Sequence, residues 1–97
     1  MFSREHKYAL GERIKNETLN LVVNIYKANK SKAINRLTNI EAARKNIELL
    51  RLFIRLSKDL KIIGLKAFVF INSKINEVSK QLKGWFNYAN SSISQSQ

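Results

Sequence analysis

Apolar residues recur every three or four positions along most of the chain, which is the spacing of helices that bury one face. The first such repeat predicts a helix over residues 4–28, followed by a loop at 29–32. Val22 and Tyr26 widen its apolar face, which is built from Leu10, Ile14, Leu21, Ile25 and Ala28. Asparagines and charged residues occupy the other side, so one face of this helix is expected to pack in a core.

The second repeat predicts a helix over residues 35–61 with an unusually wide apolar surface. Thr38 and Glu41 have the spacing of a capping box, which would move the start to Asn39. In the C-terminal half, apolar side chains cover more than half of the circumference: Leu49, Leu50, Leu52, Phe53, Ile54, Leu56 and Leu60. A three-helix monomer cannot bury all of them. An exposed apolar patch and self-association are therefore expected.

The third repeat predicts a helix over residues 65–89, capped by Gly64 at the end of the preceding turn. Its apolar face consists of Phe68, Ile71, Ile75, Val78, Leu82, Trp85, Phe86 and Ala89. Segment 91–97 is rich in Ser and Gln, a composition typical of a flexible tail. The predicted fold is all-α, with one domain over 1–90. It is an antiparallel bundle of three long helices that is completed by oligomerisation.

Charge narrows the choice of partner. The 97 residues include 18 Lys and Arg but only 7 Asp and Glu, a formal net charge of +11. Such an excess opposes compaction, so we expect a partner of opposite charge. Hydrophobic residues make up 44% of the chain, too many for a disordered basic tail. RNA or DNA is the partner that best fits a folded and strongly basic protein.

Cations at helical spacing form a stripe on the predicted second helix, at Arg44, Arg51, Arg55 and Lys58. Arginine suits phosphate because its planar guanidinium donates two parallel hydrogen bonds and stays charged. Further nucleic-acid-binding candidates are Arg13 and Lys15 on the first helix and Lys66 on the third. The alternative is that the stripe is only a solvated face, in which Glu48 pairs with Arg44, Arg51 or both.

Aromatic residues divide into two groups. Phe70 and Tyr88 lie off the apolar face of the third helix and are the candidates for stacking on unpaired bases. The other candidates fall on apolar faces and are predicted to be core or interface residues: Phe53, Phe68, Trp85 and Phe86.

Catalytic and metal-binding patterns are missing from the sequence. There is no cysteine, His6 is the only histidine, and the acidic residues are scattered. We therefore expect no enzymatic activity, no cofactor and no metal. The charged N-terminus and the lack of a long apolar run predict a cytoplasmic protein with no membrane partner.

Three sequence segments occur in an order that indicates a family. They are residues 8–15 (YALGERIK), residues 49–56 (LLRLFIRL) and residues 81–85 (QLKGW). In these segments the chain resembles four-helix-bundle proteins related to the accessory variability determinant of diversity-generating retroelements. That family also includes proteins encoded by intervening sequences in bacterial large ribosomal RNA genes. The resemblance covers residues 2–86.

The resemblance implies a cytoplasmic, pentameric, positively charged helical barrel that partners a reverse transcriptase and binds RNA and DNA. Such proteins usually carry a further helix before the position of Phe2, so we expect a shortened four-helix type, either natural or from a missed upstream start. Two alternatives to this role remain. One is an adaptor whose basic face docks an acidic protein, and the other is a ribosomal-RNA-associated bundle with no retroelement role. A membrane-surface role is disfavoured, because every helix carries bulky core residues.

Overall fold

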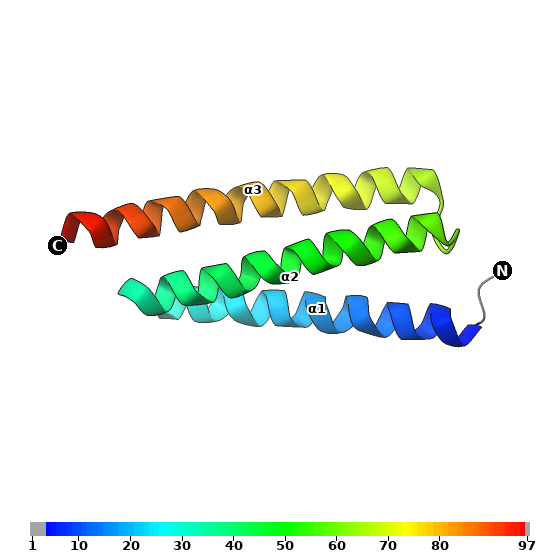
Figure 1. Ribbon diagram of the computed structural model, residues 1–97, viewed down its shortest axis with the longest axis horizontal. Coiled ribbons are helices and arrows are strands. Elements are labelled where there is room, and N and C mark those ends of the chain that lie inside the picture. The colour runs from blue at the N-terminus through cyan, green and yellow to red at the C-terminus, as the bar shows by residue number, and fades with distance from the viewer. Residues whose placement is uncertain (1–3, 97) are drawn as a thin grey trace.

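The computed structural model describes residues 4–96, with the side chains of residues 4–93. Three helices make up this part of the chain: α1 (Arg4–Lys30), α2 (Ala33–Asp59) and α3 (Leu65–Ser96). They run antiparallel in sequence order (Figure 1). The predicted all-α bundle of three long helices is confirmed.

Four predicted helix ends differ from the observed ones: α1 ends at Lys30 instead of residue 28, α2 spans 33–59 instead of 35–61, and α3 extends past residue 89. The capping box at Thr38 and Glu41 is wrong, because α2 begins at Ala33 with Lys32 as its N-cap. The Thr38 hydroxyl instead donates to the Ile34 carbonyl oxygen at 3.0 Å, inside the helix. At the other end of the chain, α3 continues past residue 89 to Ser96, through most of the segment predicted as a tail.

The turn between α2 and α3 is fixed by backbone hydrogen bonds. The Ile62 N–H donates to the Ser57 oxygen at 2.8 Å, and the Lys61 N–H donates to the Lys58 oxygen at 3.0 Å. With Lys61 in the left-handed region at φ 61°, these bonds form a Schellman motif that ends α2. The Gly64 carbonyl then accepts the first helical bond of α3, from Phe68 at 3.0 Å. Gly64 therefore caps α3, as predicted.

In Figure 1, α2 lies between α1 and α3. Over residues 4–96, the backbones of α1 and α3 each come close to that of α2 but not to each other. The molecule measures 56 × 22 × 14 Å along its principal axes. Its main core consists of buried residues from all three helices: Leu21, Ala43, Ile47, Leu50, Ile54, Ile75 and Leu82. Because α1 and α3 each pack closely only along α2, much of the surface of both helices stays exposed.

This arrangement corrects one expectation for α1. Val22 and Tyr26 were predicted to widen its core face, but both are exposed. The buried residues of α1 form a narrow stripe of Glu17, Leu21 and Ala28, because only α2 covers this helix. The apolar patch predicted on α2 is confirmed, since Leu49, Leu52 and Leu56 are exposed to 37, 49 and 38%.

A buried polar network lies between α1 and α2. The Asn46 side chain donates to Glu17 Oε2 at 2.9 Å and accepts from Asn24 Nδ2 at 2.7 Å. A shift of α1 along α2 would separate these groups and leave buried polar atoms without partners, at a cost of about 1–3 kcal/mol each. The network therefore favours one register of α1 on α2, and the same register sets which α1 side chains face outward.

Candidate nucleic-acid interface

A shallow groove runs between α2 and α3 and contains most of the predicted cationic stripe. We call it the α2–α3 groove. Its two ends share Glu48, and its cationic lining residues come mainly from α2. One end is lined by Glu41, Arg44, Lys45, Glu48, Leu49, Ser79 and Lys83, and the other by Glu48, Arg51, Leu52, Arg55, Phe68 and Asn72.

Arg51 and Arg55 differ in how they are held. The Arg51 side chain pairs with Glu48 at 3.2 Å, between Nε and Oε1, and its Nη1 donates to the Asn76 side-chain oxygen. Arg51 is therefore fixed across the groove, from α2 to α3. Arg55 is exposed, and no residue of the described part of the chain forms a hydrogen bond or ion pair with it. Its five N–H donors are available to an anion.

Arg44 and Lys58 lie on aromatic rings of α3. The Arg44 guanidinium is 5.0 Å from the centre of the Phe86 ring, and the Lys58 ammonium is 4.8 Å from that of Phe68. Arg44 also pairs with Glu41 at 3.3 Å, and Lys58 with Asp59 at 3.6 Å. These contacts orient the cations along the α2–α3 boundary.

The solvated-face alternative is thus partly right, because Arg44, Arg51 and Lys58 each have an acidic neighbour on α2. Glu48 pairs with Arg51, whereas Arg44 pairs with Glu41. Exposed ion pairs of this kind contribute only about 0–1 kcal/mol each. A phosphate group with two negatively charged oxygens can therefore compete with the carboxylates for these cations.

The other predicted site residues lie outside the groove lining. Arg13 sits over the Phe53 ring at 5.1 Å, between α1 and α2. Lys15 is exposed on α1, and Lys66 is exposed in the first turn of α3. The structure therefore brings Arg44, Arg51 and Arg55 together in the groove, with Lys58 beside it, and leaves Arg13, Lys15 and Lys66 apart from it.

Sequence reasoning missed part of the groove. Lys45 and Lys83 lie on opposite walls of one end, and Ser79 lines the same end. Only the antiparallel register of α2 and α3, which sets Arg44 beside Phe86, places Lys83 next to the cationic stripe.

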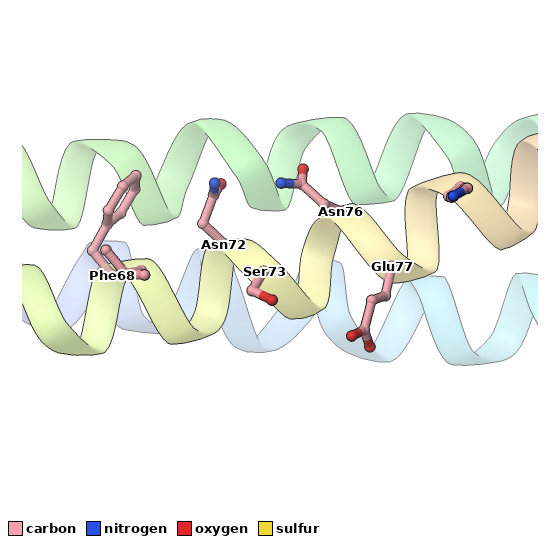
Figure 2. A pocket seen from close by; sticks show the side chains of 7 residues that line it. Phe68, Asn72, Ser73, Asn76 and Glu77 are labelled. Carbon is pink, nitrogen blue, oxygen red and sulfur yellow. The ribbon is translucent and has the colours of Figure 1, made fainter.

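A second depression on α3 adds neutral hydrogen-bonding groups beside the cations. Figure 2 shows Phe68, Asn72 and Asn76 directed toward α2, whereas Ser73 and Glu77 point away from it. Asn72 lines both this depression and the groove, and Asn76 contacts Arg51. Side-chain amides of this kind donate hydrogen bonds to phosphate oxygens without reading sequence.

The aromatic side chains are distributed largely as predicted. Phe70 and Tyr88 are exposed, and Phe68, Trp85 and Phe86 are partly buried against the core. Phe70 carries the Lys74 ammonium 5.6 Å from its ring centre. Within the described residues, neither Phe70 nor Tyr88 lines the α2–α3 groove. Base stacking on them would therefore occur away from the cationic stripe.

Residues 4–96 contain no cluster of three or more histidine or acidic side chains that could hold a metal ion. Over the same residues, no helix combines the length and apolar character that crossing a membrane requires.

The fold and the groove define a class of small, basic helical bundles whose cations gather between two helices. Residues 1–89 match the bAvd-like family, and the chain belongs to it. This is the accessory variability determinant family of diversity-generating retroelements, an accessory and not a catalytic family. No curated protein and no solved structure matches the chain.

Proposed function

We propose that this protein is a cytoplasmic, nucleic-acid-binding accessory subunit that holds RNA or DNA for the reverse transcriptase of a diversity-generating retroelement. The observation that carries the proposal is that Arg51 and Arg55 line the α2–α3 groove side by side. One arginine is held in place by Glu48 and Asn76, and the other is open to a ligand. Membership of an accessory family supports the role beside a reverse transcriptase.

The binding mechanism is phosphate neutralisation on a helical surface. Residues 44–58 of α2 cover roughly 20 Å along the helix axis, since each residue rises about 1.5 Å. Arg51 and Arg55 are four residues apart and therefore neighbours on one helix face. Cations along this length contact successive phosphates of one strand, and the Asn72 amide adds a neutral donor. Such contacts position a backbone and give little base readout.

Self-association is the second part of the proposal. The exposed residues Leu49, Leu52 and Leu56 form what we call the α2 patch. An exposed apolar patch on a long helix is typical of a protein interface. Burying it between copies of the chain would give a homo-oligomer, a pentamer by family resemblance. Leu49 and Leu52 also line the groove, so the interface between copies borders the site of the nucleic acid. Several grooves in one particle then bind a long nucleic acid far more tightly than one groove does.

Salt dependence is the most direct consequence of phosphate neutralisation. We expect the chain to bind oligouridylate and single-stranded DNA with little sequence preference. The log of the affinity should fall against log salt by about 0.7 for each phosphate contacted on a single strand. Fluorescence anisotropy at several salt concentrations measures this slope, with polyglutamate as a flexible anionic competitor. No binding at low salt, or a slope near zero, would exclude nucleic acid as the ligand, and competition by polyglutamate at equal charge would favour the adaptor role.

A further inference from the structure

A second apolar stripe lies on the outer face of α1. Leu19, Val22, Val23 and Tyr26 are exposed to 54, 58, 47 and 63%. Their spacing of three, four and seven residues places them on one helix face. The buried residues of α1 lie on its opposite face, which packs on α2, and no stretch of the α3 backbone comes close to α1. We call this set the outer α1 stripe. It is separate from the α2–α3 groove, because α2 lies between α1 and α3 (Figure 1).

Lysines flank the outer α1 stripe. Lys15 precedes it, and Lys27 and Lys30 lie at its C-terminal end, where the Lys30 ammonium is 5.7 Å from the centre of the Tyr26 ring. All three are exposed, and none forms an ion pair with another described residue. The stripe is thus an apolar strip with an uncompensated positive border.

This border disfavours a second copy of the chain as the occupant. In an antiparallel pair, setting Leu19 opposite Tyr26 of the other copy also sets Lys15 opposite Lys30, at both ends of the contact. A parallel pair sets each lysine opposite its own counterpart. Like charges that face each other across a helix pair are destabilising.

We infer that the outer α1 stripe is a docking surface for an amphipathic helix of another protein. That helix has apolar residues at three- and four-residue spacing, which cover the four exposed side chains. Acidic residues beside its apolar stripe pair with Lys15, Lys27 and Lys30. The contact would pack one amphipathic helix against another, with apolar anchors providing affinity and charges providing orientation. It does not depend on nucleic-acid binding, because the cations it uses are not those of the groove.

A pair of synthetic peptides tests the inference on the full chain. Both carry the same leucine stripe at helical spacing, flanked by glutamate in one peptide and by lysine in the other. Fluorescence anisotropy should show binding of the glutamate peptide and much weaker binding of the lysine peptide. Replacing Val22 and Tyr26 by Gln should weaken binding of the glutamate peptide about tenfold or more, since two side chains that the bound peptide would cover lose their apolar surface. The matched control Leu65→Gln, on an exposed apolar residue of α3, should leave it unchanged.

Charge reversal gives a second and independent readout. Changing Lys15, Lys27 and Lys30 to Glu should invert the preference, so that the lysine peptide binds better.

Equal binding of both peptides, or no effect of the Val22 and Tyr26 changes, would overturn the inference. So would loss of peptide binding in an Arg51→Gln, Arg55→Gln variant, because the peptide would then be using the groove. A lower oligomer mass for the Val22 and Tyr26 variant would assign the stripe to a second copy instead. RNA affinity measured on the same variant should be unchanged, which separates this inference from the proposed function.

Discussion

Replacing Arg51 and Arg55 together by glutamine is expected to weaken oligouridylate binding by roughly 30-fold to 1000-fold at low salt. Each charged contact with phosphate is worth about 1–2 kcal/mol, and two lost contacts convert to that range. The fold should be retained, because both side chains lie on the surface of α2 and glutamine is a good helix former. Anisotropy gives the affinity, and circular dichroism gives the helical content and melting temperature.

A matched control removes the same charge elsewhere. Lys27→Gln with Lys30→Gln lowers the net charge equally, on α1 and away from the α2–α3 groove. Its effect on RNA affinity should be several-fold smaller. If both double variants lose affinity equally, RNA responds to net charge alone and the groove is not the site. If the arginine variant keeps its affinity but loses oligomer mass, the two arginines are subunit contacts.

Replacing Leu52 and Leu56 by glutamate is expected to convert the oligomer into monomers. Both side chains are exposed in the single chain, so the substitutions should not disturb its core. In an oligomer they would place unpaired carboxylates in an apolar interface, which costs several kcal/mol per subunit. We therefore expect the dissociation constant for self-association to rise at least about 100-fold. Light scattering at micromolar concentration measures the change in mass.

The same variant connects assembly to nucleic-acid binding. Leu52 lines the groove beside Arg51 and Arg55, so Leu52→Glu should also weaken binding of a short oligonucleotide. Leu56→Glu alone, outside the groove lining, should keep the affinity for a short oligonucleotide close to that of the parent chain and lower the affinity for a long RNA. Leu65→Glu, on another exposed leucine, is the control and should leave the mass unchanged. A parent chain that is already monomeric at micromolar concentration would contradict the assembly proposal, and so would an unchanged mass in the Leu52 and Leu56 variant.

The amino-acid pattern predicts the helices well because each contains a long, regular apolar repeat. The pattern places the end of a helix wrongly where a polar segment packs against the core of the protein. The segment after residue 90 is polar and resembles a tail, yet Ile93 packs against the small core cluster of Ala28, Leu37, Ile40 and Ala89. That single apolar contact accompanies the continuation of α3 to Ser96. Composition alone does not show that one isoleucine reaches a core to which all three helices contribute.

The width of a helix's apolar face also does not show how many other helices pack against it. Val22 and Tyr26 continue the face of Leu21 and Ile25 on a helical wheel, so sequence reasoning placed them in the core. Close packing along α1 comes from α2 on one side, and these side chains remain exposed. For α2, which has two neighbours, the same reasoning correctly predicted an exposed remainder.

The candidate site was predictable in part. Arg44, Arg51, Arg55 and Lys58 share one helix face, which the spacing alone shows. Lys45 and Lys83 belong to the groove only through the register of α2 on α3, which rests on contacts such as Arg44 with Phe86. Residues on different helices come together through packing, and a single sequence does not encode that register as a spacing.

The central claim, that nucleic acid binds in the α2–α3 groove, is tested most directly by following individual side chains during binding. Titrating the isotope-labelled chain with oligouridylate in NMR spectra reports on the side-chain amide groups of asparagine. The signals of Asn72 and Asn76 should shift and saturate at the concentration where anisotropy saturates, because these amides lie beside the arginines. Asn16 and Asn20, exposed on α1, should not change. Shifts at Asn16 and Asn20, with Asn72 and Asn76 unmoved, would contradict the account.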